Sequence, residues 1–207
     1  MPKPIFKEGK KYTFSDYFEL GNPTEEIIGE LGYSLSLKAF DFPVSKEIDK
    51  AIIEKLQSFY YELLPKISIN SEVAKREFMI APILHELLRQ VDAKLNVEYP
   101  IDIDDKLSGS IDYLLRSRQD LVVVEAKKGD LDRGFNQLAA EMIAVDKYED
   151  IDSADFLYGA ITIGEVWRFA ALDRKEKVLI KGIHTFRFPE DLEEIFAILK
   201  GILSGQA

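Results

Sequence analysis

Two carboxylates and a lysine beside apolar segments are the residues of this chain most able to do chemistry. Asp112 lies within an apolar, strand-like segment, and Glu125 and Lys127 directly follow a run of valines. Glu125 and Lys127 are two residues apart, so in a strand they share one face. Burying such charges is unfavourable unless they are paired or bind an ion. This cluster is therefore the first candidate for a functional site.

A divalent cation would stabilise this arrangement. If residues 109–115 and 120–126 pair as an antiparallel hairpin, Asp112 can approach the face that carries Glu125. The two carboxylates, with the carbonyl oxygen of Ala126, could then ligate one hard cation. Lys127 would lie beside that cation, where it could orient or deprotonate an attacking water, or neutralise charge developing on a phosphate.

Two further polar residues could support such a site. Gln137 falls on the helix expected after the hairpin and shares a helical face with Glu141. Its amide could position the water or a phosphate. Glu72, near the start of an earlier helix, could supply another carboxylate, with Glu77 and Glu86 as alternatives on the same helix.

Each of these residues also has a purely structural interpretation. Asp112 could be an ordinary strand-end carboxylate, and Glu125 with Lys127 a surface ion pair that contributes little. Gln137 could be an exposed helix residue, and Glu72 a favourable first-turn carboxylate. The apolar run before Glu125 favours the functional interpretation, because charges placed directly after a buried strand need a partner.

Hydrophobic spacing and turn residues assign the elements that must hold these side chains. Helices are predicted over residues 24–31, 45–64, 70–91, 131–147 and 191–203, with a kink at Pro82. Strands are predicted over residues 33–40, 95–103, 109–115, 120–126, 156–163, 166–172 and 178–188. This order is typical of an α/β sandwich with a mixed central sheet. The crossover helix 131–147 should make its two flanking strands parallel.

Composition narrows the chemistry further. The chain has 207 residues, a formal net charge of −10, no cysteine and two histidines, His85 and His184. The absence of cysteine excludes thiolate nucleophiles and cysteine-type zinc sites. A metal would be held by oxygen atoms, which favours Mg²⁺ or Mn²⁺. Neither an apolar run of membrane-spanning length nor a secretory signal is found, so we expect a cytoplasmic protein with no membrane partner.

Taken together, Asp112, the Glu125-Ala126-Lys127 triplet and Gln137 resemble the active-site motif of the PD-(D/E)XK nuclease superfamily. Residues 70–84, NSEVAKREFMIAPIL, look like the opening helix of the N-terminal nuclease domains of type I restriction motor subunits. That helix carries a Glu near the metal, and Glu72 matches it. Residues 158–169 look like the closing hairpin of the same group. Ile111 precedes the Asp in place of Pro, a common variation in the family, and Glu141 stands where some relatives have Tyr.

The resemblance, over about residues 70–173, implies a restriction-endonuclease-like fold: a three-layer α/β sandwich whose mixed central sheet is flanked by helices. It implies Mg²⁺- or Mn²⁺-dependent hydrolysis of a DNA phosphodiester, with RNA as the alternative substrate. In this interpretation Asp112, Glu125 and Glu72 bind the metal, Lys127 assists the water, and Gln137 supports the site.

The implied organisation is a nuclease-like domain over residues 70–207. Residues 1–69 would form an extension, part irregular and part helical, that packs on this domain. A single active site that cuts a duplex needs a second copy or a second binding event, so a homodimer is a candidate assembly.

A second hypothesis keeps the fold and gives up the activity. A catalytically weak or inactive nuclease-like scaffold would serve as a nucleic-acid-binding or protein-interaction module. The acidic net charge and the unmatched residues 1–69 favour this hypothesis. The presence of Asp112, Glu125 and Lys127 together favours the enzyme.

Overall fold

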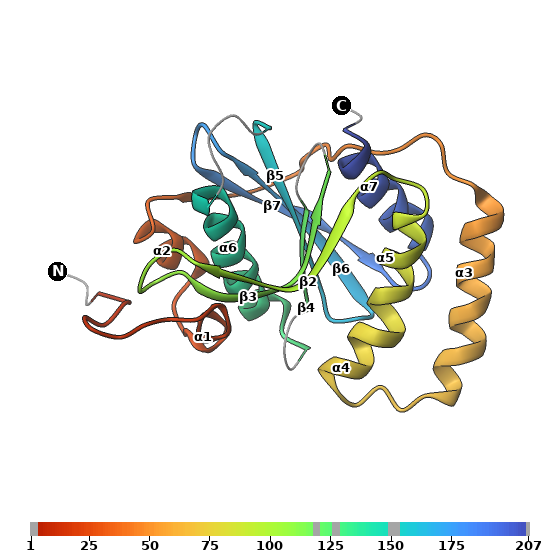
Figure 1. Ribbon diagram of the computed structural model, residues 1–207, viewed down its shortest axis with the longest axis horizontal. Coiled ribbons are helices and arrows are strands. Elements are labelled where there is room, and N and C mark those ends of the chain that lie inside the picture. The colour runs from red at the N-terminus through yellow and green to blue at the C-terminus, as the bar shows by residue number, and fades with distance from the viewer. Residues whose placement is uncertain (1–3, 118–120, 126–128, 149–153, 206–207) are drawn as a thin grey trace.

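The computed structural model describes residues 4–117, 121–125, 129–148 and 154–205, which form one seven-stranded sheet with helices on both faces (Figure 1). The strand order is β1-β7-β6-β5-β4-β3-β2. The strands are β1 (Ser34–Lys38), β2 (Lys94–Asp102), β3 (Ser108–Arg116), β4 (Leu121–Glu125), β5 (Phe156–Thr162), β6 (Val166–Asp173) and β7 (Val178–Arg187). The pairs β1–β7 and β4–β5 are parallel, and the other pairs are antiparallel. The expected α/β class with a mixed sheet is confirmed.

The middle of the chain forms the unit that carries most of the candidate residues. Strand β3 pairs antiparallel with β4, with Tyr113 opposite Val123. Helix α6 (Leu131–Tyr148) then crosses over, and β5 returns parallel to β4, with Val123 opposite Ala160. The predicted parallel pair across the crossover helix is therefore confirmed. A helical connection of this length returns the chain to the starting end of the sheet before the next strand begins.

Two helical layers bury the two faces of the sheet (Figure 1). Helices α1 (Phe14–Glu19), α2 (Thr24–Gly29) and α6 cover one face; α3 (Lys50–Leu63), α4 (Glu72–Lys75), α5 (Ala81–Leu88) and α7 (Leu192–Ser204) cover the other. Phe135 of α6 is fully buried in the first core, and Trp167 of β6 is fully buried in the second. Each large apolar side chain buried in this way stabilises the fold by about 1.5–3 kcal/mol. Among the described helices, none is long and apolar enough to cross a membrane.

Helix α1 falls in a segment that the sequence predicts to be irregular. A helix of only six residues is marginal by itself, so its apolar spacing is a weak signal. Packing stabilises it, since Phe14, Tyr17 and Phe18 are all buried. A capping box between Thr13 and Asp16 defines where it begins.

The predicted strand near residues 33–40 is present as β1, and the partner it selects lies far along the chain. Ser34 pairs with Val178 of β7, so a strand from the N-terminal segment forms one edge of the sheet. Beside it, the Tyr33 hydroxyl donates to Asp146 of α6 at 2.7 Å, and Nε of Arg174 donates to the same carboxylate at 2.9 Å. These contacts attach β1 to the crossover helix.

The helix predicted to begin at Ser45 begins later, as α3. Ser45 is buried, and its backbone N–H donates to the carbonyl of Ala197 in α7, which holds it outside the helix. Asp49 caps α3 instead, accepting a hydrogen bond from the backbone N–H of Ala51. The helix ends at Leu63, directly before the 3₁₀ turn η1 (Leu64–Lys66) that contains Pro65.

The helix predicted over residues 70–91 is interrupted, as Pro82 led us to expect. After α4, a wide π-helical turn, η2 (Arg76–Ile80), precedes α5. Pro82 has no N–H to donate into the preceding turn, which favours this break. Such wide turns are frequent at functional sites, and η2 begins at Arg76, a residue that lines the polar pocket described next.

Candidate functional site

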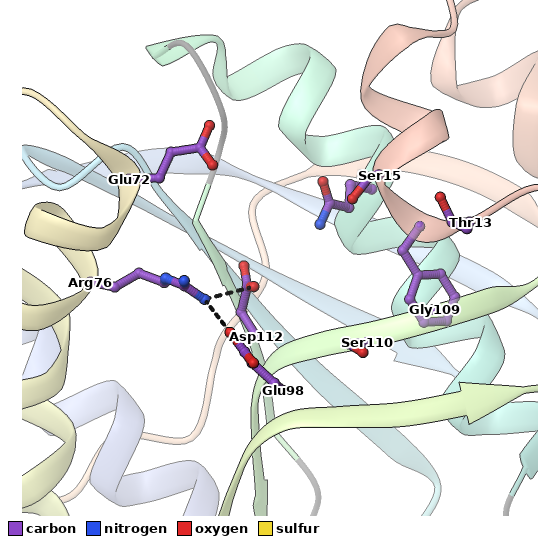
Figure 2. A pocket seen from close by; sticks show the side chains of 10 residues that line it. Thr13, Ser15, Glu72, Arg76, Glu98, Gly109, Ser110 and Asp112 are labelled. Atoms are coloured by element: carbon purple, nitrogen blue, oxygen red, sulfur yellow. Dashed lines mark hydrogen bonds and ion pairs between the residues drawn. The ribbon is translucent and has the colours of Figure 1, made fainter.

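A pocket of about 440 Å³ collects polar side chains from distant parts of the chain (Figure 2). Its lining comes from the start of α1, from α4 and η2, from strands β2 and β3, and from α6. The residues are Thr13, Phe14, Ser15, Glu72, Arg76, Glu98, Gly109, Ser110, Asp112 and Gln137. Three of the five predicted site residues, Glu72, Asp112 and Gln137, therefore line one pocket.

Asp112 lies where the pairing of β2 with β3 is interrupted. Val97 pairs with Tyr113 and Tyr99 pairs with Ile111, but the ladder is broken between them, at Glu98 and Asp112. Glu98 has a φ of 50°, an unusual conformation for a residue other than glycine. Holding such a backbone costs about 1–3 kcal/mol, and this cost is common at functional sites.

The interruption changes which side of the sheet each residue faces. Ile111 and Tyr113 are two residues apart, so a regular strand would place them on the same face. In the structure Ile111 packs into the core under α6, whereas Tyr113 packs into the core under α5. The strand therefore rotates at Asp112, where side chains no longer alternate regularly between the two faces of the sheet. The half-buried Asp112 carboxylate lines the pocket.

Arg76 joins the two acidic residues at this interruption (Figure 2). Its Nη1 atom lies 3.3 Å from Oδ1 of Asp112 and 3.5 Å from Oε1 of Glu98. The side chains of Arg76 and Asp112 are each 23% exposed, while that of Glu98 is 66% exposed. The partner in the less solvated position, Asp112, makes the stronger ion pair.

Glu72 stands one helical turn before Arg76, so both side chains lie on the face of the helix that borders the pocket. Ser71 caps this helix, because its hydroxyl accepts a hydrogen bond from the backbone N–H of Ala74 at 3.1 Å. Of the three acidic residues considered for this helix, Glu72 is the one that lines the pocket. Glu77 is exposed outside it, and Glu86 pairs with Arg89.

Gln137 presents a buried amide to the same pocket from α6. Its Nε2 atom donates to Oε1 of Glu141 at 3.0 Å, and both side chains are buried. Its Oε1 atom is also buried and accepts no hydrogen bond from the described residues. Leaving a buried acceptor in this state costs about 1–3 kcal/mol, which a bound water or ligand would offset.

The structure describes the backbone of Glu125 without its side chain, and Lys127 lies outside the described residues. Strands β3 and β4 are antiparallel with Tyr113 opposite Val123. From that pair, one strand runs back to Asp112 and the other runs forward to Glu125. The two backbone positions therefore lie at the same end of the hairpin. The roles of Glu125 and Lys127 remain predictions.

The N-terminal segment forms one wall of the pocket. Thr13 makes a parallel bridge with Ser108, and the Ser108 hydroxyl donates to the carbonyl of Tyr12 at 2.9 Å. Phe14 rests directly on Gly109, which has a φ of 135°. The pocket is thus completed by residues outside the region that resembles the nuclease family.

The donors around the pocket suit a hard cation. Three carboxylates and one guanidinium line it, together with Gln137. Oxygen ligands of this kind are preferred by Mg²⁺ and Mn²⁺. Within the described ranges, which leave out the Glu125 side chain, no three acidic or histidine side chains lie close enough to hold a metal ion.

Sequence reasoning missed Arg76, Glu98 and the wall formed by Thr13, Phe14 and Ser15. Arg76 had a usable signal, since it lies four residues after Glu72 and so shares its helical face. Glu98 had no such signal in the sequence, because a single acidic residue in a strand usually faces solvent. The wall depends on a contact between segments about a hundred residues apart, which local patterns do not encode.

The fold and the pocket are the basis for assigning function, because the sequence comparisons add no relative. No family model matches the chain, and no curated protein matches it.

Proposed function

We propose that this chain has a restriction-endonuclease-like fold and is a Mg²⁺- or Mn²⁺-dependent nuclease that hydrolyses phosphodiester bonds of DNA. The observation that carries the proposal is the shared pocket of Asp112, Glu72 and Gln137. These residues come from a strand and two different helices, and residue type and spacing in the sequence select all three. The hairpin register, which brings the backbone of Glu125 to the same end as Asp112, supports the same proposal.

The residues proposed to hold the metal are Asp112, Glu125 and Glu72. Asp112 is half-buried on a strand and offers a fixed oxygen, whereas Glu72 is exposed on a helix and can adjust its side chain. When bound, the metal would lower the pKa of an attacking water and offset negative charge on the phosphate.

Gln137 and Lys127 are proposed to act on the attacking water and the phosphate. Glu141 accepts the amide hydrogen of Gln137, which orients the amide and leaves its buried Oε1 atom as an unused acceptor among the described residues. Lys127 is proposed to orient the water or to neutralise charge that develops on the phosphate.

The experiment pairs metal binding with DNA cleavage. Mn²⁺ binding is followed by electron paramagnetic resonance, and cleavage is followed on supercoiled plasmid, single-stranded DNA and RNA with Mg²⁺ or Mn²⁺. We expect nicking by the wild type and loss of both Mn²⁺ binding and nicking in Asp112→Asn. Lys127→Ala should keep Mn²⁺ binding and cut about 10²–10⁴-fold more slowly.

Asp102→Asn is the matched control. Asp102 is an exposed acidic residue of β2 that pairs with Lys11 and does not line the pocket. Its substitution should leave both readouts unchanged. If the pure wild-type protein cuts none of the three substrates with either metal, the nuclease proposal is wrong.

One observation favours the second candidate, a nuclease-like module without activity that binds nucleic acid or protein. The guanidinium of Arg76 already neutralises Asp112, as expected of a site that holds no divalent ion. For this candidate, Mn²⁺ binding would be absent in both the wild type and Asp112→Asn.

A further inference from the structure

We propose that Arg76 is the phosphate-binding residue of this pocket, that it is paired with Asp112 until a divalent ion binds there, and that Glu98 then retains it. This inference rests on the proposed nuclease function. No motif in the sequence identifies Arg76 as a site residue. Its guanidinium and the divalent ion would compete for the carboxylate of Asp112.

The geometry leaves Arg76 with unused hydrogen-bonding capacity. Both of its ion pairs, to Asp112 at 3.3 Å and to Glu98 at 3.5 Å, run through Nη1. A guanidinium has five N–H donors in a planar fork. In the part of the chain that the structure describes, neither Nε nor Nη2 makes an ion pair or a side-chain hydrogen bond. These donors are available to the two oxygens of a phosphodiester.

The position of Arg76 suits that ligand. It extends from η2 toward Asp112 on β3 and Glu98 on β2 (Figure 2). Its side chain is only 23% exposed, so its interactions are less screened by water than those of a surface arginine. A phosphate bound by metal at Asp112 and Glu72 would lie within this same pocket, because both carboxylates line it.

Arg76 and a divalent ion cannot both bind the Asp112 carboxylate, because their positive charges repel each other. An arginine stays protonated in proteins, so its attraction to Asp112 cannot be removed by deprotonation. A divalent ion on Asp112 would compete for that carboxylate and repel the guanidinium. Glu98 offers Arg76 a second, more exposed carboxylate that is not a proposed metal ligand, which keeps the side chain beside the pocket after it leaves Asp112.

The backbone at Glu98 supports this assignment. If Arg76 served only to hold η2 against β3, its ion pair with Asp112 would be sufficient. Yet Glu98, the second residue that Arg76 contacts, adopts a φ of 50°. Strain of this kind is typical of functional sites.

The test uses the full chain, with Mn²⁺ affinity measured without nucleic acid and DNA affinity measured separately. Arg76→Gln removes the competing charge, so its Mn²⁺ affinity should rise about fivefold or more. Its affinity for a DNA oligonucleotide in Ca²⁺ should fall. The dependence of the logarithm of that affinity on the logarithm of salt concentration should become shallower by about one, since one phosphate contact is lost.

Three further variants separate these effects from simple loss of structure. Arg76→Lys keeps the charge without the fork, so its Mn²⁺ affinity should resemble the wild type while its DNA affinity is reduced. Glu98→Gln should weaken DNA binding with little effect on Mn²⁺ affinity. Arg89→Gln, on the same helical segment but exposed and paired with Glu86, should change neither. If the role of Arg76 is only structural, Arg76→Gln should show no rise in Mn²⁺ affinity and no change in the salt dependence of DNA binding.

The outcomes distinguish this inference from the function on which it rests. If the wild type binds Mn²⁺ and cuts DNA, but Arg76→Gln alters neither Mn²⁺ affinity nor the salt dependence, only the role of Arg76 is wrong. If the wild type binds no Mn²⁺ and Arg76→Gln does, the competition is supported and the nuclease proposal is wrong. If neither protein binds Mn²⁺, both proposals are overturned.

Discussion

Phe14 packs so closely on Gly109 that a side chain at position 109 would crowd it against β3. A Cβ atom at position 109 would lie 3.0 Å from Cδ2 of Phe14 and 3.2 Å from its backbone nitrogen. The φ of 135° at Gly109 is a conformation that side-chain-bearing residues rarely adopt. This contact fixes the wall of the pocket against the strand that carries Asp112.

Gly109→Ala is therefore expected to destabilise the protein by about 1–3 kcal/mol, through backbone strain and displacement of Phe14. Urea denaturation measures the loss. Gly29→Ala is the control, because nothing lies within 4 Å of a Cβ at that helical position. The control should be neutral or stabilising by up to about 1 kcal/mol. Equal effects of the two changes would contradict the packing argument.

Glu72→Gln should weaken Mn²⁺ binding about tenfold or more, because a charged ligand is replaced by a neutral one. Glu77→Gln is the matched control: it removes the same charge from the same helical segment, but Glu77 is exposed outside the pocket. Titration calorimetry with Mn²⁺ compares the two. A similar loss in both variants would mean that only the overall charge matters and that Glu72 is not a ligand.

Asp146→Asn should destabilise the fold by about 1–3 kcal/mol, because it weakens a part-buried ion pair with Arg174. The side chains of Asp146 and Arg174 are only 13% and 12% exposed. Asp155→Asn breaks an exposed pair with Lys175 and should cost less than about 1 kcal/mol. Thermal or urea denaturation checks the difference. A loss that is no larger in Asp146→Asn would show that this contact does not hold β1 and α6 together.

The start of α1 should lose stability in acid. A hydrogen bond from the backbone N–H of Thr13 holds the pKa of Asp16 below its ordinary value of 3.8. A carboxyl whose pKa is lowered on folding contributes stability above its unfolded pKa, and this contribution is lost as the pH falls through the folded pKa. Asp16→Asn should therefore be less stable than the wild type by about 0.5–1 kcal/mol at pH 7.

This difference should shrink as the pH falls below about 4, where the wild-type carboxyl is itself protonated. Urea denaturation at pH 7, 5 and 3 measures it. Glu8→Gln, an exposed change outside the helix, should show no such pH-dependent difference. A constant gap between Asp16→Asn and the wild type at all three pH values would rule out the carboxylate as its cause.

Much of the fold could be predicted because its elements carry strong local signals. The valine run of β4, the long apolar face of α6 and the Gly164 turn between β5 and β6 each indicate one element, and the crossover helix predicts the parallel pair. The predicted start of the helix at Ser45 was wrong, because tertiary contacts decide where that helix begins. Ser45 could cap a helix by its residue type, but its backbone N–H is taken by Ala197, and the helix begins after Asp49.

The sequence by itself determined the α/β class, most of the strands, and the candidates Asp112, Glu72 and Gln137, because residue type and spacing are local properties. Only the tertiary structure decided that these three share a pocket, that β3 rotates at Asp112, and that Arg76 and Glu98 lie beside it. The physical reason is distance along the chain. The pairing of Arg76 with Asp112, and the packing of Phe14 on Gly109, join segments whose approach is set by burying two cores and not by any local pattern.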